Sequence, residues 1–183
     1  MVYEAGLKKA WDDLEKIADA SCYSVALLGD TYEVNVKERR VFSNSCNIPA
    51  KDYFSILILH YLTGSLENKY VPCGEWVSFK DIEGGEIYYP AYKEGVIDHL
   101  LKKYGRSPEG LLSVLERFHG NKINDSDAAI ELVTFPDVRV RIIVWKADEE
   151  FGPEATLLFD KNLPKLYTME DITVFSHCIV NTL

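Results

Sequence analysis

Apolar side chains recur at helical spacing in the first third of the chain. One amphipathic pattern predicts a helix along residues 7–18, with charged residues on its opposite side. The apolar face of this helix is formed by Leu7, Ala10, Trp11, Leu14, Ile17 and Ala18. A second run, residues 53–62, is apolar on nearly every side and predicts a central buried helix, which Pro49 is placed to open and Gly64 to end.

The middle and the end of the chain carry further helical patterns. Residues 89–104 have one apolar stripe, and Gly105 supplies a C-terminal stop. The next helix is predicted to begin at Ser107-Pro108, because serine suits an N-cap and proline suits the first turn. A capping box from Thr168 to Asp171 predicts the start of the last helix.

Short β-prone runs lie at both ends of the chain. They are residues 23–28, 31–36, 40–42, 128–135, 138–145 and 155–159. Gly29-Asp30 and Pro136-Asp137 predict tight connections between neighbouring runs. Because strands cluster at the two ends and helices in the middle, we predict an α+β fold. We expect one mainly antiparallel sheet of about six strands packed against four to five helices, in a single domain covering residues 1–183.

Composition narrows the range of partners. The 183 residues include 20 basic and 29 acidic side chains, which give a net charge of −9. A surface of that charge repels phosphate backbones and anionic lipids, so we expect neither nucleic-acid nor membrane binding. No stretch approaches the roughly 20 apolar residues of a membrane span. Since the N-terminal sequence also lacks the order of a signal peptide, we expect a cytoplasmic protein.

The cysteines offer no ready cluster of metal ligands. They are Cys22, Cys46, Cys73 and Cys178, and no two of them form a Cys-x-x-Cys pair. This spacing argues against a zinc ribbon or an iron–sulfur motif and favours free thiols. Cys73 lies in a loop, and the sequence shows no cationic partner that would activate it.

The most distinctive feature of the chain is an acidic block along residues 145–171. Its candidate catalytic residues are Asp148, Glu149, Glu150 and Glu154. Further acids follow at Asp160, Glu170 and Asp171. Converging carboxylates bind divalent metal ions, or raise the pKa of one acid enough to make it a proton donor. The alternative, which we favour, is a solvated hairpin followed by acids that cap the last helix.

His60 lies within the predicted apolar helix and, of the four histidines, is the strongest candidate for a functional role. Such a histidine ligates the metal of a haem or a corrinoid when aromatic neighbours line the pocket. Alternatively, it is a core histidine that is hydrogen-bonded to a carbonyl or a tyrosine hydroxyl. His119 lies at a predicted helix end, where a cation suits the helix dipole. His99 and His177 fall at helix edges, where we expect them to be solvated.

Two motifs resemble those of a known family. The first is Gly-Glu-Trp-Val-Ser-Phe-Lys-Asp-Ile-Glu-Gly-Gly at residues 74–85, preceded by Leu-His-Tyr-Leu-Thr-Gly at 59–64. The second runs from Trp145 to Asp160 and is followed by Glu170-Asp171. In this order they are similar to the motifs of domain-of-unknown-function family 3786, an uncharacterised family of anaerobic bacteria and archaea. The resemblance spans most of the chain.

The resemblance implies a cellular setting rather than a reaction. It suggests work near the corrinoid or iron–sulfur enzymes of anaerobes, and some members look like fusions to a cysteine-rich iron–sulfur segment. This chain departs from those members because its cysteines provide no cluster ligands. The aromatic residues of the two motifs, Trp76, Phe79 and Trp145, join His60 as candidate ligand-binding residues.

Three hypotheses about function follow. The leading one is a non-catalytic accessory domain that binds a tetrapyrrole, a corrinoid or a redox-protein partner, because the chain is aromatic-rich and lacks a nucleophile–base arrangement. The second is a hydrolase or lyase that uses the acids of residues 148–154, with or without a divalent metal. The third is a structural interaction module. If the motif aromatics and the acids met around one concave pocket, a shared site would be indicated.

Overall fold

The computed structural model describes residues 3–124 and 126–183. Within these ranges the α-helices are α1 (Glu4–Glu15), α2 (Asp52–Leu66), α3 (Gly85–Tyr92), α4 (Asp98–Tyr104) and α5 (Met169–Thr182). The strands are β1 (Cys22–Leu27), β2 (Asp30–Asn35), β3 (Arg40–Ser43), β4 (Ile48–Pro49), β5 (Trp76–Ser78), β6 (Gly120–Ile123), β7 (Ala128–Phe135), β8 (Val138–Trp145) and β9 (Glu154–Asp160). The 3₁₀-helical segments are η1 (Phe79–Asp81), η3 (Pro108–Glu116) and η4 (Leu163–Lys165), and η2 (Lys93–Ile97) is a π-helical turn.

The predicted α+β class and the antiparallel pairing are confirmed. The strands are divided between two sheets, ordered β1-β2-β3-β4 and β5-β9-β8-β7-β6, rather than collected in one sheet of about six. The short strands β4, β5 and β6 have no counterpart among the predicted runs. No helix of the described chain is both long and apolar enough to cross a membrane.

The β1–β2 hairpin joins the two sheets. Leu27 pairs with Asp30, so the turn consists of Leu28 and Gly29, which both have positive φ, of 49° and 78°. Two such residues form a turn whose twist matches that of the flanking strands. The Leu28 side chain is buried, and its backbone N–H donates to the carbonyl of Thr134 in β7 over 2.8 Å. The hairpin tip is therefore part of the contact between the sheets.

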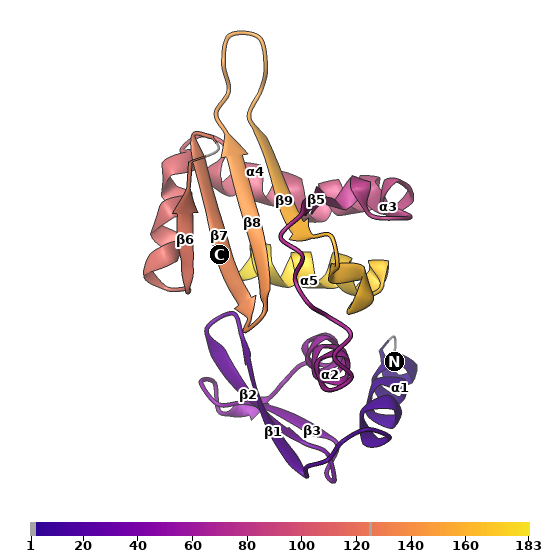
Figure 1. Cartoon of the computed structure of the whole chain (residues 1–183). Helices are drawn as coiled ribbons and strands as arrows, with labels where there is room; N and C mark the ends of the chain where they lie inside the picture. The colour runs from indigo at the N-terminus through magenta and orange to yellow at the C-terminus, as the bar shows by residue number, and fades with distance from the viewer. Residues whose placement is uncertain (1–2, 125) are drawn as a thin grey trace.

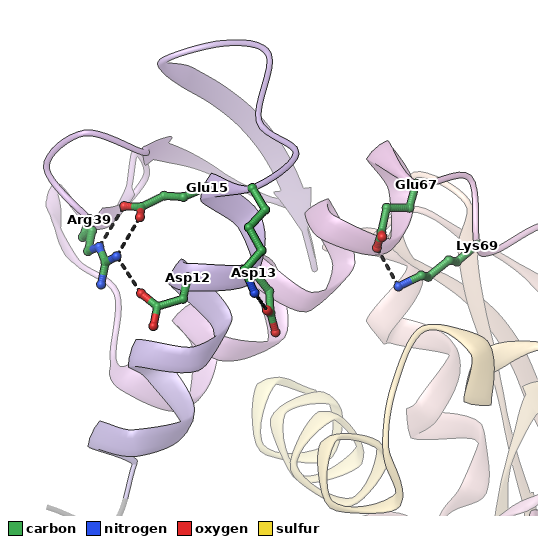
Figure 2. Close-up of polar contacts among 7 residues, drawn as sticks. Asp12, Asp13, Glu15, Arg39, Glu67 and Lys69 are labelled. Carbon is green, nitrogen blue, oxygen red and sulfur yellow. Dashed lines mark hydrogen bonds and ion pairs between the residues drawn. The ribbon is translucent and has the colours of Figure 1, made fainter.

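Ion pairs connect α1 to the turn between β2 and β3. The Arg39 guanidinium lies 2.7 Å from Asp12 and 2.7 Å from Glu15, as Figure 2 shows. Because all three side chains are more than one-third exposed, water and salt screen these pairs, and their main effect is on orientation.

The central helix α2 is buried as predicted, but both of its predicted boundaries are wrong. Pro49 lies in β4, where it pairs with Phe42, and the helix begins three residues later at Asp52. Gly64 lies inside the helix, which continues to Leu66. A side chain at position 64 would overlap Leu166, so the glycine permits a close approach instead of ending the helix.

The five-stranded sheet contributes one face to the main core. In β8, Val138, Val140, Ile142 and Val144 are at most 1% exposed, while Arg139 on the opposite face is exposed. The predicted connection at residues 136–137 joins β7 to β8. Figure 1 shows α4 and α5 behind this sheet, where they cover its apolar face, whereas α3 lies beyond the edge formed by β5.

Residues 85–104 form one helical stretch with an irregular centre. The predicted helix began at residue 89, whereas the structure begins it at Gly85, after Gly84 with a φ of 82°. A π-helical turn, η2, separates α3 from α4 and was not predicted. Ser107 makes no side-chain cap, and the segment after it is a 3₁₀ helix. The capping box of α5 is confirmed in both of its hydrogen bonds.

Candidate functional site

Of the candidate catalytic acids, Asp148, Glu149 and Glu150 lie on the loop that joins β8 to β9, which extends beyond the sheet in Figure 1, and Glu154 is the first residue of β9. Asp148, Glu149, Glu150 and Glu154 are all exposed. The Asp148 carboxylate accepts the backbone N–H groups of Glu150 and Phe151 over 2.8 and 2.7 Å, and these bonds lower its pKa. Asp148 therefore stabilises the turn itself.

A metal site is not assembled in this loop. In residues 3–124 and 126–183, no three histidine, cysteine, aspartate or glutamate side chains are grouped to hold a metal ion. The catalytic role of the four acids stays a prediction, and the exposed hairpin supplies neither a concavity nor converging carboxylates to support it.

The three motif aromatics lie in different places. Trp76 pairs with Asp160 at one end of β9, and Trp145 pairs with Glu154 at the other end. Six residues of strand separate these positions by about 20 Å. Phe79 is buried in the core, where its ring stacks on Tyr92 at 3.8 Å between centroids. Trp76, Phe79, Trp145 and the acidic loop therefore do not surround one pocket.

The two sequence motifs do meet at Asp160. This carboxylate is buried and accepts the backbone N–H groups of Cys73, Gly74 and Asn162 over 2.8–2.9 Å. Burial alone would raise the pKa of Asp160, but these hydrogen bonds outweigh burial and keep the pKa below its ordinary value of 3.8. The contact between the motifs thus fixes the loop before β5 to the end of β9.

A cavity of about 420 Å³ adjoins this contact, with Trp76 in its wall. The Arg141 guanidinium lies 4.1 Å from the centroid of a Trp76 ring. Glu131 forms ion pairs with both Arg139 and Arg141, over 2.9 and 3.0 Å. Because both arginines pair with the Glu131 carboxylate, their positive charge is partly compensated within the cluster.

A longer depression lies between α2 and α5, and we call it the α2–α5 groove. It consists of three adjoining cavities of about 530, 300 and 210 Å³. The first two share Tyr3, Tyr53 and Val174, and the last two share His60, Thr168 and Asp171. The groove therefore runs from an aromatic end, past His60, to a polar end.

His60 and Asp171 form a pair at the centre of the groove. His60 Nδ1 lies 3.1 Å from Asp171 Oδ2, which also accepts the N–H and hydroxyl of Thr168. Burial raises the pKa of Asp171, but the hydrogen bonds from His60 and Thr168 outweigh it and hold the pKa below 3.8. An ionised Asp171 makes Nδ1 the protonated nitrogen, so a neutral His60 carries its lone pair on Nε2.

The exposure of this pair suits a binding site. The His60 side chain is 32% exposed, whereas that of Asp171 is 10% exposed. Nε2 has no hydrogen-bond partner in the described part of the chain. A buried carboxylate that orients a partly open imidazole is the arrangement found behind metal-ligating histidines and general bases.

The aromatic end of the groove is mainly apolar. Tyr3, Tyr53 and Phe54 form a cluster with ring centroids 5.1–6.4 Å apart. Cys178 lies beside them, and burial raises the pKa of its thiol to about 12. The aromatic rings offer faces for stacking, and the protonated Cys178 thiol is a poor nucleophile.

His177, which we expected to be solvated, is partly buried in the same cavity. Burial lowers its pKa, and His99 lowers it further. The ring lies against Gly95 in the π-helical turn, so closely that a side chain at position 95 would overlap it. The expectation failed because the packing partner lies on a helix distant in sequence.

The residues that line the groove recur at helical spacing in the sequence. On α2 the lining residues are Tyr53, Phe54, Ile56, Leu57, His60, Thr63 and Gly64. On α5 they are Glu170, Asp171, Val174, His177, Cys178, Asn181 and Thr182. Both sets follow the spacing of one helix face and mix polar with apolar side chains. Which two faces oppose each other is a tertiary property that the spacing does not specify.

Comparison with known proteins gave one match. The family model described as "Domain of unknown function (DUF3786)" matches residues 10–182, which confirms the resemblance of the two motifs. Both helices of the groove lie within the matched range. No curated protein and no solved structure matches the chain.

Proposed function

We propose that this chain, which belongs to the Domain of unknown function (DUF3786) family, is a non-catalytic accessory domain that binds a tetrapyrrole or corrinoid in the α2–α5 groove. The observation that carries the proposal is the His60–Asp171 pair. Asp171 accepts a hydrogen bond from the Nδ1–H group of His60. The lone pair that could ligate a metal is therefore on Nε2, beside a cavity. Histidines that ligate metals characteristically donate their other ring N–H to a carboxylate in this way.

The residues around the pair suit a planar, largely apolar ligand. His60 lines a cavity of about 300 Å³, and the adjoining aromatic cavity measures about 530 Å³; both volumes lie within the range of small-molecule sites. Tyr53, Phe54 and Val174 supply apolar surface against which a macrocycle packs. His60 would hold the metal of the ligand, and Asp171 would fix the imidazole ring. The bound group itself would supply the metal chemistry.

The test is a visible-absorption titration with haem and with cobalamin. We expect one of them to give a saturable spectral change with the wild-type protein. His60→Ala should remove the residue that would hold the metal and shift or abolish that change, whereas His119→Ala, at an exposed histidine outside the groove, should leave it intact. Absence of a spectral change with both ligands would refute the tetrapyrrole proposal.

The acid-dependent hydrolase or lyase is the weaker alternative. It requires Asp148, Glu149, Glu150 and Glu154 to bind a metal or to share protons, and all four are exposed on a hairpin. Calorimetry with calcium, magnesium and manganese should therefore give no saturable binding heat. A heat that disappears when the four acids are changed to alanine would restore this alternative.

The setting of the proposed function follows from charge and family. With a net charge of −9, the domain would work in the cytoplasm beside corrinoid or iron–sulfur enzymes, without contacting nucleic acid or membrane. The interaction-module hypothesis is supported by the exposed neighbours Ile87 and Tyr88 on α3. Sedimentation velocity with and without haem would detect a dimer if that surface were self-complementary.

A further inference from the structure

The polar end of the α2–α5 groove collects lysines in an otherwise acidic chain. Lys9 from α1, Lys69 from the segment after α2, and Lys165 from η4 line the cavity of about 210 Å³. We call this set the lysine end. It adjoins His60, Thr168 and Asp171, which also line the cavity next to the aromatic end. A ligand on His60 therefore has basic side chains on one side and aromatic rings on the other.

The carboxylates near the lysine end are already engaged. Asp13 forms an ion pair with Lys16 over 2.7 Å, and Asp171 accepts hydrogen bonds from His60 and Thr168. Lys69 pairs with Glu67. Lys9 lies near enough to Asp13, in the same cavity, to lower the pKa of that carboxyl, but neither Lys9 nor Lys165 has a carboxylate within ion-pair distance in the described ranges of the chain. The cavity thus keeps two ammonium groups without close ion-pair partners, although the protein as a whole carries a net charge of −9.

Thr63 provides a second, independent indication of a polar ligand. Its Oγ1 atom is buried, lines the same cavity as the lysines, and has no hydrogen-bond partner among the described residues. A buried hydroxyl without a partner is destabilising, and this cost is relieved when an acceptor arrives. Because the Oγ1 atom is buried, the Thr63 side chain would have to turn toward the cavity to donate to an anion that the lysines attract.

We propose that the lysine end binds an acidic group of the ligand, so that the ligand is an amphipathic carboxylate rather than a neutral macrocycle. This inference rests on the proposed function, because it assumes that the macrocycle occupies the groove next to His60. Lys9 and Lys165 supply the charge, Thr63 supplies a hydrogen bond, and the aromatic end holds the apolar body. Selectivity between tetrapyrroles would then depend on their carboxylate side chains.

The experiment compares haem, which carries two propionate groups, with its dimethyl ester, which has the same ring and metal without the charges. Wild-type protein should bind haem at least about tenfold more tightly than the ester, as one good charged contact would give. Lys9→Gln/Lys165→Gln should remove that ratio by weakening haem alone. Lys122→Gln/Lys146→Gln, at two exposed lysines outside the groove, is the control and should preserve the ratio.

The outcomes separate this inference from the proposed function. Equal affinity of the wild type for haem and ester, or an unchanged ratio in the Lys9/Lys165 variant, would overturn the carboxylate inference while the groove remains a tetrapyrrole site. Failure of both ligands to bind the wild-type protein would refute both. A preference for haem that falls as salt is raised, and falls less in the lysine variant, would support the inference.

Discussion

Two buried carboxylates hold together segments that lie far apart in the chain. Asp160 accepts N–H groups from residues 73 and 74, and Asp171 accepts a bond from His60, which is 111 residues away. The four candidate catalytic acids, Asp148, Glu149, Glu150 and Glu154, are instead exposed. Within the acidic block, the acids that connect distant segments are therefore Asp160 and Asp171.

Asp160→Ala should destabilise the protein by about 1–3 kcal/mol, because three backbone N–H groups would lose a buried acceptor. Asp148→Ala is the matched control, since that carboxylate also accepts backbone N–H groups but is fully exposed. Urea unfolding of the two variants measures the difference. An equal loss at both positions would contradict the importance of burial.

Stability should fall in acid. The pKa values of Asp160 and Asp171 lie below 3.8 in the folded protein, so the unfolded chain takes up protons first as the pH falls. Their stabilisation is complete well above pH 3.8 and is lost progressively as the pH drops through and below that value. Thermal unfolding between pH 7 and pH 3 measures this effect. Asp160→Asn should make the melting temperature depend less on pH. A pH dependence identical to that of the wild type would contradict a contribution from Asp160.

At the scale of elements, regular patterns were predictable and irregular ones were not. The β7–β8 pair and the capped α5 follow from alternation and a capping box that lie within single segments. Gly64 was misread because a glycine that permits close packing and a glycine that ends a helix look alike in sequence. The π-helical turn η2 has no recognised sequence pattern, and its partner His177 lies some 80 residues later.

The contact between Gly95 in η2 and His177 in α5 gives an element-scale prediction. Gly95→Ala should destabilise the protein by about 1–3 kcal/mol, because the new methyl group would overlap the imidazole ring. In an unhindered helix the same change would stabilise it by up to about 1 kcal/mol. Adding His177→Ala removes the obstacle, so the double variant should lose less than the sum of the single variants.

Additive free energies of unfolding would show that the two residues do not meet. The same measurement bears on the groove, since the π-helical turn places Gly95 where it fixes the position of His177.

At the scale of the whole molecule, the groove exists because two structural units meet. Helices α1 and α2, which pack with the N-terminal sheet, contribute one side, and α5, which packs on the five-stranded sheet, contributes the other. The sequence predicts each helix but not that the two face each other, so it does not indicate that His60 pairs with Asp171. A pairing across 111 residues depends on the assembled core rather than on local spacing.

The predicted single domain implies that the two sheets unfold together. The bond from Leu28 to Thr134 and a shared apolar core connect them. Calorimetry should therefore give one transition, whose measured enthalpy equals the van't Hoff enthalpy. Two resolved transitions would show that the N-terminal sheet is an independent unit, and that the groove lies at an interface between domains.

The position of the binding site is the point on which the functional proposal depends most directly. Backbone amide NMR with zinc protoporphyrin, a diamagnetic probe, reports on every candidate region at once. We expect the largest shift changes within residues 53–64 of α2 and 168–181 of α5, which flank His60 and Asp171. Changes concentrated at residues 146–154 of the acidic hairpin or around Trp76, or no saturable change at all, would contradict a tetrapyrrole site in the α2–α5 groove.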